Sequence, residues 1–243
     1  MSSVALITGA ARRVGAATAR CLHEKGMNIV IHYHTSVDEA QNLCADLNAR
    51  RADSAITCAT DLNDLPALTD LVNMTLAAFG RCDLLVNNAS RFYPTPLNTV
   101  TETVWEDLFS SNLKGAFFLS QALYPHLKAV QGAIINITDI HARQPMKDYP
   151  VYCMAKAGLA MMTAVLAKEM SPEVRVNAVA PGVVAWPEHI NALSATEQAR
   201  LVDKTLLKRA GEVNDIAEAV AFLYEAPYIT GQTLTVDGGR SLK

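Results

Sequence analysis

The sequence predicts a single α/β domain built on a doubly wound parallel sheet with helices on both faces. Short β-branched segments alternate with longer segments of helical periodicity along the whole chain. The β-branched segments are continuously apolar, as strands are when helices cover both of their faces. At 243 residues, half of them hydrophobic, the chain can bury one substantial core. We find no internal repeat, low-complexity tract or linker, so residues 1–243 are expected to form one domain.

The individual elements follow from this alternation. The segments expected to be strands are Val4–Thr8, Asn28–His32, Ser54–Cys58, Leu84–Asn87, Ala133–Thr138, Arg175–Val179 and Thr233–Val236. Helical periodicity is clearest in Gly15–Lys25, Val37–Arg50, Leu65–Phe79 and Tyr152–Met170. Ser36, followed three residues later by Glu39, is expected to form a capping box that starts the second of these helices.

Composition and charge exclude several kinds of partner. A net charge of -3 gives no basic field, so we expect neither nucleic acid nor a membrane as a partner. Five scattered cysteines without a C-x-x-C motif are typical of reduced thiols, which predicts a cytoplasmic protein. The N-terminal segment has no basic region or cleavage site and is interpreted as a strand, not a signal peptide. No uninterrupted apolar run reaches the length of a transmembrane helix.

The first chemical motif is the glycine-containing turn TGAARRVG at Thr8–Gly15, between the first strand and the first helix. A turn in this place presents backbone N–H groups and the positive end of a helix to a pyrophosphate. Such a turn in isolation is often only a tight turn. Its position after the first strand favours a dinucleotide site in a Rossmann-like fold.

The end of the second strand indicates which dinucleotide is bound. Folds that bind NAD usually place an acidic residue there to hold the ribose 2′-hydroxyl, whereas this chain has His32-Tyr33-His34-Thr35-Ser36. Arg12 supplies a positive charge for a 2′-phosphate, and Asp38 belongs to the first turn of a helix, where acids are favoured anyway. The sequence therefore predicts NADPH. The alternative for His32 and His34 is that they are strand residues without a ligand; a metal site is disfavoured because no further cluster completes it.

Tyr152 and Lys156 form the third motif. Residues four apart lie on one face of a helix, so the phenol and the ammonium point the same way. A neighbouring cation lowers the pKa of a tyrosine, which makes it a proton donor near neutral pH. The alternative is a core-facing tyrosine beside a solvated lysine.

Taken together, these motifs resemble those of the short-chain dehydrogenase/reductase family along essentially the whole chain. The resemblance also rests on Asn87-Asn88-Ala89, Asn112, Arg175-Val176-Asn177 and Val236-Asp237-Gly238-Gly239. It implies that Tyr152 delivers a proton, that Lys156 holds the nicotinamide ribose, and that Asn112 organises a water relay. The cofactor-binding positions it implies are Arg12, Arg13, Val14, His34, Thr35, Ser36, Asp61, Leu62, Asn88, Ala89, Ser90, Tyr152, Lys156, Pro181 and Gly182.

Two departures from the usual family pattern bear on the substrate. Arg13 replaces the middle glycine of the turn, and Asp139 stands thirteen residues before Tyr152, where ketone-reducing members have a serine. A carboxylate has no proton to donate and would repel a developing oxyanion, at a cost of several kcal/mol in a dry site. Asp139 therefore argues for a substrate rich in N–H groups. The alternative is that Asp139 only caps the turn after the fifth strand.

The same two departures occur in pteridine reductases, and in this respect the chain resembles that group of the family. That resemblance implies that Phe92 stacks on a pterin, that Ser90 hydrogen-bonds it, and that Arg13 reaches both cofactor phosphate and pterin. It makes Asp139, Tyr152 and Lys156 the catalytic residues, with Asp139 and Tyr152 sharing delivery of the proton to the ring nitrogen. The predicted substrate-binding residues are Arg13, Ser90, Phe92, Asp139 and Tyr152. Thr35 departs from the arginine found in some of these enzymes.

The leading hypothesis is NADPH-dependent reduction of a dihydropterin or dihydrofolate to the tetrahydro form; reduction of oxidised pterins is left open. A ketoreductase acting on an acyl thioester or sugar ketone is the alternative, and a non-catalytic NADPH-sensing protein is a third. The family resemblance implies a homotetramer. Residues Val183–Leu201 are expected to form a substrate lid, and the tail Arg240–Lys243 to approach a neighbour's active site.

Overall fold

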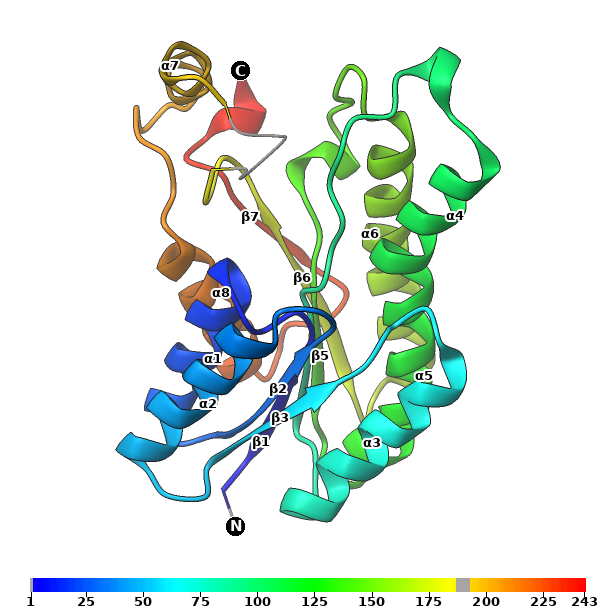
Figure 1. Ribbon diagram of the computed structural model, residues 1–243, viewed down its shortest axis with the longest axis vertical. Helices are drawn as coiled ribbons and strands as arrows, with labels where there is room; N and C mark the ends of the chain where they lie inside the picture. Colours follow the sequence, from blue (N-terminus) through cyan, green and yellow to red (C-terminus); the bar gives the residue numbers. More distant parts are fainter. Residues whose placement is uncertain (1, 187–192) are drawn as a thin grey trace.

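The computed structural model describes residues 2–186 and 193–243 and shows a parallel sheet in the order β3-β2-β1-β4-β5-β6-β7 (Figure 1). The strands are β1 (Val4–Ile7), β2 (Asn28–Tyr33), β3 (Ala55–Ala59), β4 (Leu84–Asn87), β5 (Ala133–Ile137), β6 (Arg175–Pro181) and β7 (Thr233–Val236). Every predicted strand is present, with its ends shifted by no more than a few residues. The strand order reverses between β1 and β4, and a dinucleotide binds at this kind of switch point in doubly wound sheets.

Helices cover both faces of the sheet. They are α1 (Arg13–Glu24), α2 (Val37–Arg50), α3 (Leu65–Phe79), α4 (Glu102–Phe109), α5 (Gly115–Ala129), α6 (Pro150–Met170), α7 (Ala195–Asp203) and α8 (Val213–Glu225). Helices α1, α2 and α8 pack on one face, and α3, α5 and α6 on the other (Figure 1). Each face has its own apolar cluster, so the continuously apolar strands are buried on both sides.

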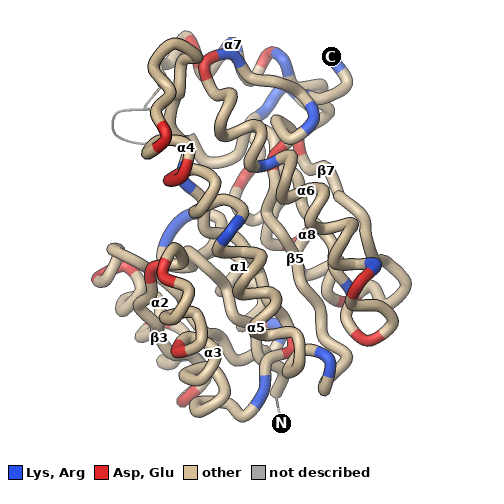
Figure 2. Tube along the Cα trace, turned by 90° about the vertical axis from the view of Figure 1, so that its right-hand side faces the viewer, with Lys and Arg blue, Asp and Glu red and all other residues tan. Residues whose placement is uncertain are grey.

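Helix α6 is long and apolar enough to cross a membrane by length and composition alone, and no other described helix meets that test. Its apolar face packs into the core through Leu159, Met162 and Leu166. It is therefore a core helix of the domain. Figure 2 shows acidic and basic residues interspersed along the chain, in keeping with the net charge of -3.

The predicted capping box at the start of α2 is wrong. Ser36 is the N-cap residue, but its side chain makes no capping hydrogen bond. The carboxylate of Glu39 lies 3.6 Å from the guanidinium of Arg12 instead. A complete capping box occurs at α7, where Ser194 and Glu197 bond reciprocally. The expected lid, Val183–Leu201, includes the first part of α7, and its residues 187–192 lie outside the described residues.

Candidate active site

The predicted site residues gather where the strands end. Thr8 follows β1, Asn88 follows β4, Asp139 comes shortly after β5, and Gly182 follows β6. Carboxyl ends of parallel strands meet at one edge of a sheet, so segments far apart in sequence are brought together there. This edge also holds the point at which the strand order reverses.

The turn after β1 is shaped so that glycine is favoured at Gly9 and required by close contacts at Gly15. Gly9 has a φ of 60°, and a Cβ on Gly15 would lie 2.3 Å from the carbonyl oxygen of Gly9. The amide Nδ2 of Asn88 donates to the carbonyls of Thr8 and Gly9, at 2.8 and 3.0 Å. The turn therefore approaches both the loop after β4 and the start of α1 closely. A cradle of this shape fits the pyrophosphate of a dinucleotide.

Arg13 adopts the left-handed backbone conformation, with a φ of 54°, at the position where the family pattern has glycine. A non-glycine residue in this conformation costs about 1 kcal/mol. Its guanidinium donates to the carbonyls of Ala185 and Trp186. Arg13 thus joins the glycine turn to the segment that follows β6. Its predicted contacts with cofactor and pterin remain predictions.

The residues at the tip of β2 divide into two groups. His32 is buried, and burial lowers its pKa to about 4. Its Nδ1 accepts from the backbone N–H of Gly9 at 3.1 Å, and its Nε2 bonds the carbonyl of Thr60 at 3.0 Å. His32 is therefore a neutral structural residue, as one of the alternatives held. His34 and Thr35, by contrast, are exposed, and His34 lies 3.9 Å from Asp61.

Other predicted cofactor positions have a packing role. Leu62 is buried in the core cluster on the α3 side, and Val14 packs against the cluster on the opposite face. A Cβ on Gly182 would lie 2.5 Å from the Cβ of Asp237, so the turn after β6 must pass close to the end of β7. Within residues 2–186 and 193–243, no group of three or more His, Cys, Asp or Glu side chains is placed to hold a metal ion.

The predicted catalytic residues do come together. The hydroxyl of Tyr152 donates to Oδ2 of Asp139 at 2.7 Å, and Nζ of Lys156 donates to the carbonyl of Ile137 at 2.9 Å. The ammonium lies 5.8 Å from the centre of the Tyr152 ring. Oδ1 of Asp139 accepts from the backbone N–H of His141 at 2.8 Å. Asp139 thus caps the turn after β5, but it is more than a cap, because its other oxygen accepts from the phenol.

Charges in this cluster differ from the sequence-based expectation. The pKa of Tyr152 is raised well above its usual value by burial, and next by the charge and hydrogen bond of Asp139. Burial lowers the pKa of Lys156 to about 8, and Asp139 opposes that shift. The net shift of the Tyr152 pKa is therefore upward, opposite to the sequence-based expectation, and desolvation and the Asp139 carboxylate are its main causes. Tyr152 keeps its proton at neutral pH.

The loop after β4 supplies the polar and aromatic wall of the site. Ser90 Oγ donates to Oδ1 of Asn112 at 2.6 Å, and Asn112 lies in a π-helical turn between α4 and α5. Such turns often mark functional sites. The ring of Phe92 meets that of Tyr152 edge-on at 4.9 Å and stacks on that of Tyr149 at 4.7 Å. Phe92, Ser90 and Tyr152 therefore share one surface.

Comparison with known proteins agrees with this geometry. Residues 9–241 match the family described as enoyl-(acyl carrier protein) reductase. Pteridine reductase 1 of Leishmania tarentolae is 36% identical over 280 residues, covering 98% of this chain and 96% of that protein. A 3-oxoacyl-[acyl-carrier-protein] reductase of Staphylococcus epidermidis is 36% identical over 244 residues, covering 98% of this chain and 99% of that protein. A putative ketoacyl reductase of granaticin polyketide synthesis from Streptomyces violaceoruber is 34% identical, covering 98% and 96%.

The chain belongs to the short-chain dehydrogenase/reductase family. It is therefore an oxidoreductase of the kind that uses NAD(P)H, and the cradle at Gly9 and Gly15 fits that cofactor. Two relatives with the same identity of 36% are named for the reduction of different substrates. Family membership therefore does not fix the substrate of this short-chain reductase.

Sequence reasoning missed Tyr149 of this short-chain reductase site, and it placed Arg240 only in a tail expected to approach a neighbouring active site. Tyr149, three residues before Tyr152, stacks on Phe92, and no motif marked it. Arg240 lies in the 3-10 helix Arg240–Leu242, close enough to Asp139 to be attracted to it, while burial lowers its pKa. The tail is fixed to the turn after β5 by a 2.7 Å bond from Gln144 to the carbonyl of Ser241. In this chain the tail thus covers its own active-site turn; an approach to a neighbouring subunit stays a prediction.

Proposed function

We propose that the protein reduces a pterin ring with NADPH, converting a dihydropterin or dihydrofolate to its tetrahydro form. The observation that carries this proposal is the carboxylate of Asp139 bonded to the phenol of Tyr152 at 2.7 Å. The family's ketone-reducing members have a hydroxyl at this position. A carboxylate there suits a substrate that offers N–H groups and gains a proton on nitrogen.

The surface around this pair fits a flat heterocycle. Phe92 provides an aromatic face beside Tyr152, and aromatic rings pack favourably on polarisable planar rings. Ser90 adds a hydroxyl at the same surface. A 2-amino-4-oxo ring offers donors and acceptors that match a carboxylate, a hydroxyl and a guanidinium. Arg240 offers a guanidinium that is attracted to Asp139, and Arg13 is the second guanidinium that the family resemblance implies for the pterin.

NADPH is the proposed cofactor because the end of β2 lacks an acidic residue and Arg12 lies beside it. Arg12 pairs with Glu39 at 3.6 Å with half of its side chain exposed, so its guanidinium remains accessible to a 2′-phosphate. Thr35 and Ser36 add hydroxyl donors on the same loop. A phosphate accepts from all of these groups.

Proton delivery is the role of the chain's own residues, since NADPH supplies the hydride when it is bound. Hydride addition to the carbon of a C=N bond leaves an electron pair and a negative charge on the nitrogen. Tyr152 donates the proton from its hydroxyl to that nitrogen, and Asp139 holds the phenol in place. Lys156, buried against Ile137, compensates the charge left on the phenol oxygen.

The test follows NADPH oxidation with 7,8-dihydrobiopterin, dihydrofolate, acetoacetyl thioester and a sugar ketone in parallel. Turnover of either pterin, together with its loss in Asp139→Ala, supports the proposal. The Asp139→Ala variant is not expected to gain activity on the ketones. Turnover of the thioester with neither pterin would instead favour the ketoreductase function that the bacterial relatives suggest.

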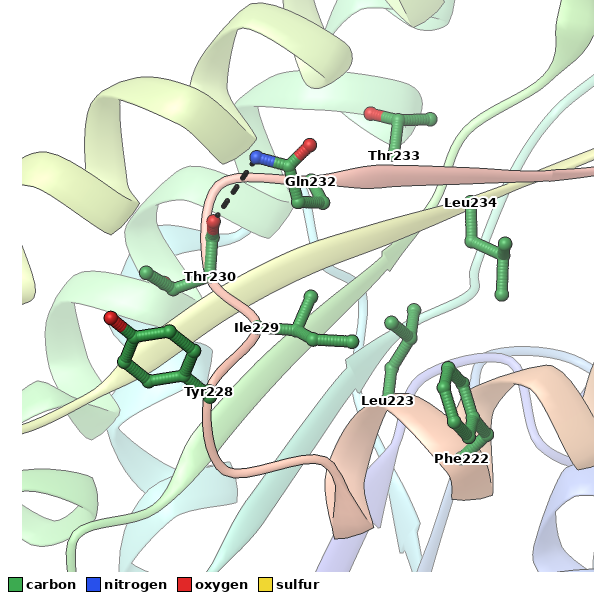
Figure 3. Close-up of a pocket in the computed structure, with 8 residues that line it drawn as sticks. All are labelled: Phe222, Leu223, Tyr228, Ile229, Thr230, Gln232, Thr233 and Leu234. Carbon is green, nitrogen blue, oxygen red and sulfur yellow. Dashed lines mark hydrogen bonds between the residues drawn. The ribbon is translucent and has the colours of Figure 1, made fainter.

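The proposal includes a cytoplasmic homotetramer. Apolar side chains are exposed on two separate surfaces: Met161 and Val165 on α6 with Phe117 on α5, and Phe222 on α8 with Tyr228 on the loop before β7. Figure 3 shows a pocket formed at the second surface, beside edge strand β7. Two exposed apolar surfaces suit a tetramer with two kinds of interface. A monomer in light scattering at micromolar concentration would overturn this assembly.

A further inference from the structure

Asp107, in the last turn of α4, bonds the residues on both sides of Phe92. Its Oδ1 pairs with Nη1 of Arg91, and its Oδ2 accepts from the hydroxyl of Tyr93 at 2.6 Å. The Asp107 side chain is only 26% exposed, so the two bonds form in a partly desolvated place. One carboxylate thus holds two alternate residues of the loop after β4.

This arrangement constrains the residue between them. The segment around Phe92 has neither helix nor strand, so its conformation depends on side-chain contacts. Arg91 and Tyr93 are both held against α4, and the ring of Phe92 between them has its centre 4.9 Å from that of Tyr152. Fixing both neighbours limits the directions in which the Phe92 ring can point.

A second anchor acts on the same loop from the same helical region. Nδ2 of Asn112 donates to the carbonyl of Arg91 at 3.0 Å and to that of Leu108 at 2.9 Å. The loop is therefore fixed by a backbone contact through Asn112 and by two side-chain contacts through Asp107. The contacts of Asp107 involve both neighbours of Phe92.

We propose that Asp107 is a positioning residue for the substrate: it fixes, through Arg91 and Tyr93, the ring of Phe92 that forms the wall of the substrate site. This inference rests on the proposed function, because it takes Phe92 to be the surface on which the pterin stacks. Burial and the hydrogen bond with Asp107 raise the pKa of Tyr93 to about 12, so the Tyr93 donor persists throughout the range of an enzyme assay.

The test compares Asp107→Ala and Asp107→Asn with the wild type. Asp107→Ala should raise the dihydrobiopterin KM about tenfold and lower kcat severalfold, whereas the NADPH Kd stays within twofold. Asp107→Asn keeps one acceptor oxygen, so its dihydrobiopterin KM and its kcat should lie between those of the wild type and those of Asp107→Ala. Tyr93→Phe and Arg91→Ala each remove one bond and should show smaller effects. Glu106→Ala, an exposed neighbour on α4, is the matched control and should behave as wild type.

A double-mutant cycle separates positioning from a general loss of structure. If Asp107 acts through Phe92, Asp107→Ala should add less than twofold to the defect of Phe92→Ala. Full additivity in that cycle, or an unchanged KM and kcat in Asp107→Ala, would overturn the inference while the proposed function stands. Wild-type protein that turns over no pterin would overturn the proposed function, and the inference with it.

Discussion

Tyr152 donates a 2.7 Å hydrogen bond to a carboxylate oxygen of Asp139, while the other oxygen of Asp139 caps the turn after β5. The turn therefore fixes the carboxylate, and the carboxylate fixes the phenol. Burial and this carboxylate together raise the pKa of Tyr152, so the phenol keeps its proton at neutral pH in this structure. Lys156 lies behind the ring and is itself desolvated.

Tyr152→Phe removes the donor and leaves the ring contact with Phe92 in place. We expect kcat to fall at least about a hundredfold, the usual scale of general-acid catalysis, with NADPH binding retained. Stopped-flow turnover and NADPH fluorescence titration measure the two effects. Tyr124→Phe, on α5 and outside the site, is the control. Near-normal kcat in Tyr152→Phe would exclude this phenol as the proton donor.

Arg12 and Glu39 should have opposite effects on NADPH use. Arg12→Ala loses a charge-assisted contact worth about 1.5–3 kcal/mol, so the NADPH KM should rise roughly ten- to a hundredfold, with NADH use unchanged. Glu39→Gln frees the guanidinium from an exposed ion pair worth about 0.2–1 kcal/mol, and the NADPH KM should fall up to about fivefold. Steady-state kinetics with both cofactors check this. Equal use of NADH and NADPH by the wild type would contradict it.

Asn136 joins a buried polar network below the site. It accepts from Asn87 at 2.8 Å and donates to Thr163 at 2.9 Å, which ties β4 and α6 to β5. Asn136→Ala leaves both partners buried without these bonds, so we expect a loss of about 2–4 kcal/mol in urea unfolding. Asn73→Ala, exposed on α3, should change stability by less than about 0.5 kcal/mol. Equal unfolding midpoints for the two variants would rule out this role.

The tail carries Arg240, whose charge attracts Asp139. Deleting Arg240–Lys243 should raise the pterin KM without unfolding the protein, because the deletion removes a cation from the site but no core residue. Arg240→Leu should reproduce most of that increase, and Lys243→Ala, which removes an exposed side chain, should not. An unchanged pterin KM in the deletion variant would show that the tail does not act on the substrate.

Local pattern was enough to predict the strands, the glycine turn and the shared helix face of Tyr152 and Lys156, because periodicity and spacing are properties of neighbouring residues. The grouping of Asp139 with this pair came from the family resemblance. Contacts between distant residues were not predictable in this way. Glu39 turns to Arg12 instead of capping its helix with Ser36. Asp107 carries no motif, since its significance comes from the loop that the fold brings beside it. Arg240 belongs to the tail that the sequence analysis singled out, but its attraction to Asp139 depends on the fold. The raised pKa of Tyr152 likewise depends on burial, which spacing alone does not determine.

We expect Lys156 to lower the stability of the fold while it supports catalysis. Its ammonium is buried, and its pKa falls from 10.5 in the unfolded chain to about 8 in the folded one. The unfolded chain thus binds more protons between these values, so this group destabilises the fold fully below about pH 8, and the penalty is relieved as pH rises toward 10.5. The lowered pKa of Lys156 corresponds to a loss of roughly 3 kcal/mol in the free energy of unfolding. The hydrogen bond from Lys156 to Ile137 offsets about 1 kcal/mol of that loss.

Lys156→Met keeps the length of the side chain and removes its charge. We expect it to abolish turnover and weaken NADPH binding, yet to raise the free energy of unfolding at pH 7 by about 2 kcal/mol. The difference from wild type should shrink through pH 9 and nearly vanish by pH 10, since every other titrating group is common to both proteins. Urea unfolding at pH 7, 8.5 and 10 measures this difference. A methionine variant less stable than wild type at pH 7, or a difference independent of pH, would show that Lys156 is not a destabilising buried charge.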